Sequence, residues 1–125
     1  MTIQAVIDQV DRLKTNMFPI EQKIAWINEL EGKVWSEIVQ EHEWMPSGIE
    51  YHGYDDTTNP GTVLLVPDAY ADVYVHYMMA KMDDANRETN EYTKHMLMFN
   101  AAWQTLCDYW GRKFMPKRVV TQFVL

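Results

Sequence analysis

Two histidines and their acidic neighbours are the side chains of this sequence that are best suited to bind a metal ion. His76 and His95 fall on two predicted helices that would lie side by side, and Asp72 or Glu91 would complete a set of metal ligands there. Imidazole and carboxylate groups are common metal ligands, but the spacing matches no dedicated metal motif. A histidine among aromatic and methionine residues is more often a hydrogen-bonded core residue. We therefore predict no metal site and no cofactor.

The sequence also lacks the patterns of general acid–base and nucleophilic catalysis. Asp55-Asp56 and Asp83-Asp84 are adjacent acids, whereas an acid–base pair needs two carboxylates that converge on one cleft. Adjacent acids usually serve as turn and cap residues instead. There is no glycine-rich phosphate loop, HExxH, CxxC or GxSxG motif. These observations predict that the protein is not an enzyme and has no catalytic residues.

The histidines lie in a stretch, residues 64–110, with the periodicity of a helical hairpin. Large apolar side chains recur there at steps of three and four residues, in arms predicted at about 68–84 and 88–111, with Gly111 ending the second arm. The stripe includes Met78, whereas Met79, Met82 and Met98 fall partly off it and are expected nearer to solvent. The predicted core of the hairpin consists of Tyr70, Val73, Tyr77, Tyr92, Met96, Phe99, Trp103, Leu106 and Trp110.

The rest of the chain is arranged around this hairpin. Amphipathic patterns predict two further helices, at about 3–14 and 19–42. The helical period disappears between residues 43 and 67, which predicts an irregular or β segment. In it, 48–54 and 62–66 either pair as a small β-hairpin or cover the helices as an extended flap. An extended tail is expected at 112–125. The sequence therefore predicts a mainly α, single-domain protein with four helices over residues 1–125.

Composition and charge bear on location and partners. The single cysteine cannot form an internal disulfide, which favours synthesis in a reducing cytoplasm. No apolar run approaches the roughly 20 residues of a membrane-spanning helix. The net charge is −7, with −11 on residues 1–111 and +4 on the remainder. An acidic body disfavours a nucleic-acid-binding surface, whereas the basic, β-prone tail is a candidate for protein interaction through Arg112, Lys113, Lys117, Arg118, Val120 and Phe123.

Two long segments of the chain resemble a known family. They are IQAVIDQVDRLKTNMFPIEQKIAWINELEGKVWSEI, residues 3–38, and LLVPDAYADVYVHYMMAKMDDANRETNEYTKHMLMFNAAWQTLCDYW, residues 64–110. Both are similar to the head–tail connector (adaptor, head-completion) proteins of siphophages and prophages of Gram-positive bacteria. The resemblance extends over 3–38 and 63–116 and has no catalytic motif.

The resemblance implies a role in virion assembly. Members of that family are α-helical and form a ring, commonly of twelve copies, beneath the portal. The implied partners are further copies of the chain, the portal protein and tail or neck components, and DNA would pass the channel without specific binding. The implied location is the virion neck, after synthesis and assembly in the host cytoplasm. No membrane contact is implied.

Two other functions remain open from the sequence. One is a small cytoplasmic helical module or regulator that binds a single protein partner through exposed tryptophan and methionine side chains. The other, less favoured, is a metal-dependent enzyme that uses His76, His95 and nearby carboxylates.

Overall fold

The computed structural model describes residues 1–40 and 51–114, and these residues form a mainly α-helical protein, which confirms the predicted fold class. A π-helical turn, Trp35–Val39, continues the second helix, and a 3₁₀ turn, Asp68–Tyr70, precedes the third. Residues 41 and 42 of the helix predicted at 19–42 lie outside the described part. The α-helices are α1 (Ile3–Leu13), α2 (Ile20–Val34), α3 (Asp72–Ala85) and α4 (Thr89–Lys113).

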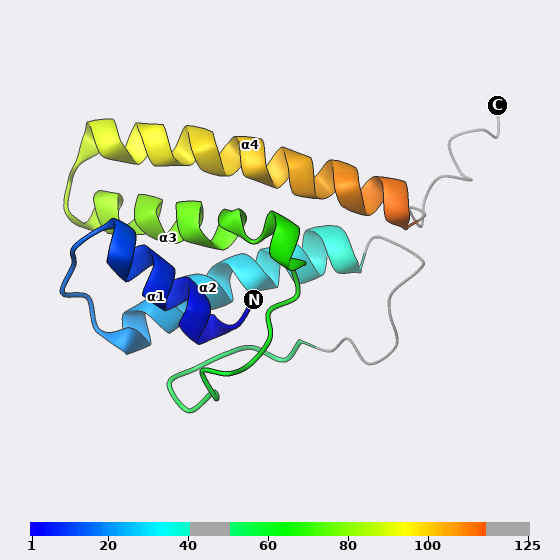
Figure 1. Cartoon of the computed structure of the whole chain (residues 1–125), viewed down its shortest axis with the longest axis horizontal. Helices are drawn as coiled ribbons and strands as arrows, with labels where there is room; N and C mark the ends of the chain where they lie inside the picture. The colour runs from blue at the N-terminus through cyan, green and yellow to red at the C-terminus, as the bar shows by residue number, and fades with distance from the viewer. Residues whose placement is uncertain (41–50, 115–125) are drawn as a thin grey trace.

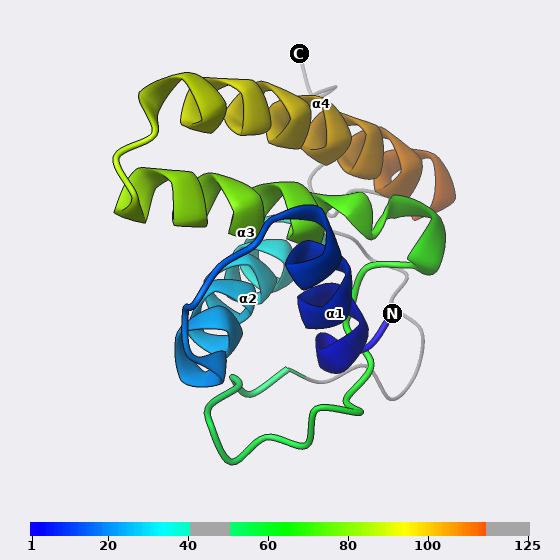
Figure 2. The same cartoon turned by 60° about the vertical axis from the view of Figure 1, so that its left-hand side comes forward.

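Helix α3 lies at the centre of the fold. Figure 2 shows α3 between α4 on one side and the pair α1 and α2 on the other. Side chains are therefore buried on several sides of α3 and not along one stripe. For example, the consecutive residues Val73, Tyr74 and Val75 are all buried. The expectation that Met82 lies towards solvent is wrong for this reason, since Met82 is fully buried. Met98, on the peripheral α4, is exposed.

Helices α3 and α4 run antiparallel as a hairpin (Figure 1). Of the residues predicted to form the hairpin core, Val73, Phe99, Leu106 and Trp110 are buried, whereas Tyr70, Tyr77, Tyr92, Met96 and Trp103 are half-buried. Two of the half-buried rings still pack against aromatic neighbours, with centroid distances of 4.5 Å for Tyr70–Tyr109 and 5.9 Å for Phe99–Trp103. The partial exposure of Tyr92, Met96 and Trp103 follows from the position of α4, which is covered by protein mainly on its α3 side.

The C-terminal end of α4 differs from the sequence prediction. The helix continues to Lys113, so Gly111 does not end it, and Arg112 and Lys113 are helical rather than part of an extended tail. Aromatic packing holds this last turn in place, because the rings of Trp110 and Phe114 lie 5.0 Å apart. The Phe114 N–H also donates a 2.9 Å hydrogen bond to the Trp110 carbonyl.

Substituting Gly111 with alanine tests this correction. Gly111 does not have a positive φ, and a Cβ there would meet nothing within 4 Å. We therefore expect Gly111→Ala to raise the free energy of unfolding by about 0.5 kcal/mol, since alanine loses less backbone entropy in a helix. Urea denaturation measures the change. A loss of about 1 kcal/mol would instead indicate the left-handed helix end that the sequence predicts.

The irregular segment 51–67 packs across the start of α1 (Figure 1). Backbone hydrogen bonds join the Leu64 N–H to the Met1 carbonyl at 2.8 Å and the Ile3 N–H to the Thr62 carbonyl at 3.1 Å. They form one isolated antiparallel bridge, and no β-strand occurs within residues 51–67. The predicted β-hairpin is thus not found in the described residues, which do not include 48–50 of its first strand. The apolar run pairs with the N-terminal segment instead.

Candidate functional site

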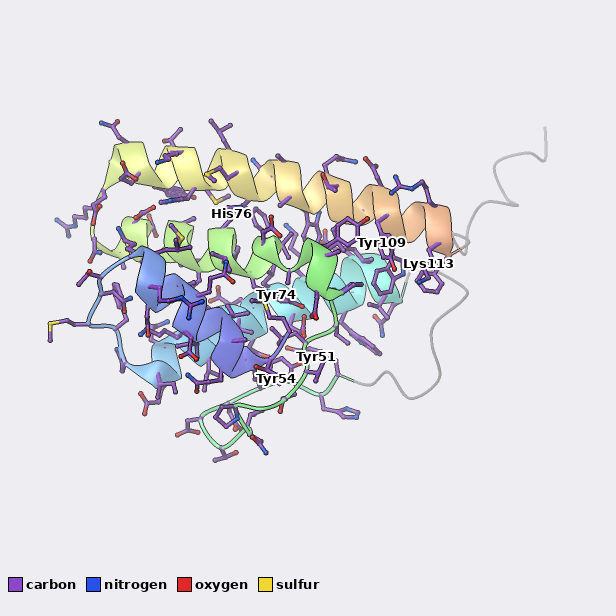
Figure 3. All side chains as sticks on the ribbon, in the orientation of Figure 1. Tyr51, Tyr54, Tyr74, His76, Tyr109 and Lys113 are labelled. Atoms are coloured by element: carbon purple, nitrogen blue, oxygen red, sulfur yellow. The ribbon has the colours of Figure 1, made fainter. Side chains whose placement is uncertain are left out.

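A buried glutamate on α2 fastens the irregular segment to the helices. Glu31 is fully buried, and its Oε2 atom accepts hydrogen bonds from the Tyr54 hydroxyl and the Leu65 N–H, both at 2.9 Å. Its Oε1 atom accepts a hydrogen bond of 2.6 Å from the Tyr74 hydroxyl. Figure 3 shows Tyr54 and Tyr51, from the irregular segment, on the side of the bundle where Tyr74 lies. Glu31 thereby connects α2, α3 and the irregular segment.

Burial dominates the electrostatics of this network. Desolvation raises the pKa of Glu31, although the hydrogen bonds from Tyr74, Leu65 and Tyr54 act in the opposite direction. Burial and the neighbouring Glu31 carboxylate likewise raise the pKa of both tyrosines, so the phenols stay protonated and donate. This arrangement suits a structural role for Glu31, as a buried hydrogen-bond acceptor surrounded by donors.

One feature of the sequence indicates that Glu31 is buried. Glu31 occupies the apolar stripe of α2, four residues after Ile27 and three before Val34, and both of these are buried. An acid at such a position must find donors inside the protein, because an unpaired buried charge is very unfavourable.

A second buried acid lies at the turn end of the hairpin. Asp83 is fully buried, and the Lys14 Nζ atom lies 2.9 Å from its Oδ1 atom. The Nδ1 atom of His95 pairs with the other carboxylate oxygen, Oδ2. The Lys14 Nζ atom also lies 3.4 Å from Glu88. The cluster connects the end of α1 to α3 and α4, and the hydrogen bond with Asp83 raises the pKa of Lys14.

This cluster changes the interpretation of the candidate metal ligands. His95 is paired with Asp83, which lies in the last turn of α3 rather than in a turn between helices, so the prediction of Asp83 as a turn or cap residue is wrong. His76, which is labelled in Figure 3, is half-buried. Burial lowers its pKa. In residues 1–40 and 51–114, no group of three or more histidine, cysteine or acidic side chains is placed to hold a metal ion.

A shallow cleft of about 310 Å³ opens beside the buried acid, at the turn between α3 and α4. Its lining is formed by Asp83, Asp84, Arg87, Glu88, Thr89, Tyr92 and Thr93. His95 does not line the cleft, so only the aspartate of the His95–Asp83 pair borders it.

Large apolar side chains are exposed on two surfaces elsewhere on the molecule. The end patch, defined as Leu13, Met17 and Ile20, surrounds the connection between α1 and α2, where Met17 is 97% exposed. The α4 outer face consists of the exposed side chains of α4 from Lys94 to Asp108. It includes Leu97, which is 65% exposed. Exposed apolar groups on a highly charged protein commonly mark protein contacts.

The predicted interaction residues of the C-terminal segment are only partly within the structure. Arg112 and Lys113 are exposed in the last turn of α4, and the Lys113 Nζ atom lies 5.6 Å from the centre of the Tyr109 ring (Figure 3). The remaining four, Lys117, Arg118, Val120 and Phe123, lie outside the described residues.

Comparison with known proteins identifies no relative, because no family model, curated protein or solved structure matches the chain. Among the helices of the described residues, none has both the length and the apolar character that crossing a membrane requires.

Proposed function

We propose that this chain is a structural assembly subunit without enzymatic activity, and that it forms the head–tail connector ring beneath the portal of a siphophage. The observation that carries the proposal is the presence of two separate surfaces that expose large apolar side chains, the end patch and the α4 outer face. The resemblance of residues 3–38 and 63–116 to connector proteins specifies the kind of assembly.

Two surfaces are what a ring subunit needs. Head-to-tail contacts join different patches on neighbouring copies, so each copy must offer at least two. The end patch lies at the connection of α1 and α2, whereas the α4 outer face lies on the opposite layer of the fold (Figure 2). The basic residues at the end of α4 offer a further, polar contact for the portal or a tail component.

The charge of the body suits a channel that DNA traverses. Residues 1–111 carry a net charge of −11, and such a surface repels phosphate instead of binding it. In this proposal DNA passes the ring without specific recognition, and the protein resides in the virion neck after assembly in the host cytoplasm.

A substitution in the end patch tests the proposal in phage particles. Met17→Glu places a charge on a side chain that is 97% exposed, so the subunit should fold normally. In a phage that lacks the native gene and receives the variant in trans, we expect the fraction of heads joined to tails to fall about tenfold, the effect of losing roughly 1.4 kcal/mol at a contact. Electron microscopy of the particles provides the count.

The matched control is Asp56→Ala, in the exposed part of the irregular segment. It should leave the number of joined particles unchanged. Normal joining of heads and tails in the complete absence of the protein would refute the connector role.

The runner-up is a small cytoplasmic module that binds one protein partner, since the same exposed residues could serve a single contact. Light scattering with and without purified portal protein separates the two. A ring subunit gives discrete high oligomers on the portal, whereas a single-partner module does not.

A further inference from the structure

We propose that two copies of this chain pair antiparallel through their α4 helices, about a twofold axis that passes close to Ala101. A twofold contact joins the same patch on both copies and therefore closes on itself. The pairing goes beyond the connector role and describes the free chain, in which the α4 outer face is covered by a second copy and not by a neighbouring subunit of the ring.

The proposed contact surface is a row of exposed residues along α4. Its members recur at alternating steps of three and four, the spacing of helices that pair along their length. The opposite side of α4, with Phe99, Leu106 and Trp110, is buried against the rest of the protein, so the row faces away from it. The row consists of Glu91, Lys94, Met98, Ala101, Thr105, Asp108 and Arg112, and every member is exposed.

The order of charges along the row indicates that its binding partner is a second copy of the chain. From its N-terminal end the row reads negative, positive, three uncharged residues, negative and positive. Antiparallel pairing about Ala101 places Lys94 opposite Asp108 of the second copy, and Glu91 within one residue of Arg112. Each complementary contact occurs twice. Parallel pairing would instead place every charge opposite itself, which is strongly unfavourable.

The middle of the row permits close approach of the helices. Ala101 has the smallest side chain of the row, and Met98, which is 42% exposed, adapts its shape to an irregular contact. Leu97 flanks the row and would lose solvent exposure in the pair. These groups supply apolar burial between the two charged ends.

The charged ends are available for contact with another chain. No carboxylate within residues 1–40 and 51–114 forms an ion pair with Lys94. Asp108 accepts a hydrogen bond of 3.0 Å from Gln104 on its own helix, which leaves its second carboxylate oxygen for a cation.

The size of the contact sets the expected strength of the dimer. A helix of 25 residues is about 37 Å long, and one helix face lies at the low end of specific interfaces. We therefore expect a weak, reversible dimer whose fraction rises with protein concentration.

Charge reversal tests the pairing in the purified full-length chain. Analytical ultracentrifugation should show a monomer–dimer equilibrium. Lys94→Glu and Asp108→Lys should each weaken the dimer by at least about tenfold, because each creates two like-charge contacts. The double variant restores opposite charges and should return to within about threefold of the native dimer. Asp56→Lys, with the same change in net charge as Asp108→Lys, should have no effect.

Three results would overturn the proposal: a monomer at every concentration up to several hundred micromolar, a dimer that neither reversal weakens, or a double variant no better than the single ones. None of them bears on the connector role, whose test uses Met17 and whole particles.

A disulfide tests the position of the axis. In a Cys107→Ala background, Ala101→Cys should form a cross-linked dimer on mild oxidation, because the two copies of residue 101 lie next to each other at the axis. Asn100→Cys, also exposed but about 100° around the helix, is the control and should cross-link far less. Equal cross-linking of the two variants, or none by Ala101→Cys, would exclude an axis at Ala101.

Discussion

Replacing Glu31 with alanine is expected to lower the free energy of unfolding by about 3–5 kcal/mol. The substitution removes the acceptor of the Tyr54 hydroxyl, the Tyr74 hydroxyl and the Leu65 N–H. A buried donor that loses its acceptor costs about 1–3 kcal/mol, and the cavity left by the side chain adds to this. Urea denaturation followed by tryptophan fluorescence measures the loss.

Glu29→Ala is the matched control, because Glu29 lies on the same helix and also accepts a tyrosine hydroxyl, that of Tyr77, at 3.0 Å. Glu29 is half exposed, so water replaces the missing acceptor, and we expect a loss of no more than about 1 kcal/mol. Similar losses for the two variants would show that burial does not set the contribution of Glu31.

The pH dependence of Glu31→Gln separates burial from hydrogen bonding. Burial raises the pKa of Glu31 above its usual 4.5, so the folded protein retains a proton that the unfolded chain has released. The stability associated with this proton is complete below pH 4.5 and is lost as the pH rises through the folded-state pKa. Glutamine carries no titrating proton, so its stability relative to the native protein should increase over that range. A relative decrease would mean that the hydrogen bonds outweigh desolvation.

Replacing Asp83 with alanine should also destabilise the fold by about 3–5 kcal/mol, because it leaves Lys14 and His95 without their buried anion. Asp84→Ala provides the control one residue away, where the side chain is exposed and the expected change is within about 0.5 kcal/mol. Equal effects in denaturation experiments would contradict the buried pairing.

The same cluster predicts an alkaline transition. The hydrogen bond with Asp83 raises the pKa of Lys14 above its usual 10.5. The corresponding stability is present below pH 10.5 and is lost as the pH rises through the folded-state pKa. The loss should disappear in Asp83→Ala, and its persistence there would assign it to another group.

Hydrophobic periodicity predicted the helices well where one face is buried against protein and the other is exposed to solvent. It succeeded for most of α1, where Ile3, Val6, Ile7 and Val10 are buried, but not for Leu13 at its end, which is exposed. It failed in α3, since a helix covered from both sides has no single stripe, and Met82 was assigned towards solvent as a result. At Gly111 the local preference of glycine for helix ends was overridden by packing of the aromatic residues around it.

The buried acids were harder to predict than the helices. Asp83 acquires its surroundings from Lys14, which follows the end of α1, and from His95 on α4, so no local pattern marks it. An aspartate near a helix C-terminus is even unfavourable on local grounds, because the helix dipole is negative there. Only the packing of three helices makes this position suitable for a carboxylate.

The central position of α3 also determines how the molecule can come apart. Both layers use this helix, so neither the α3–α4 hairpin nor the α1–α2 pair can leave without uncovering side chains such as Tyr74. The network around Glu31 also ties the irregular segment to α2 and α3. Loss of one layer therefore removes much of the support of the other, and we expect residues 1–40 and 51–114 to unfold in one cooperative transition rather than as two independently melting halves.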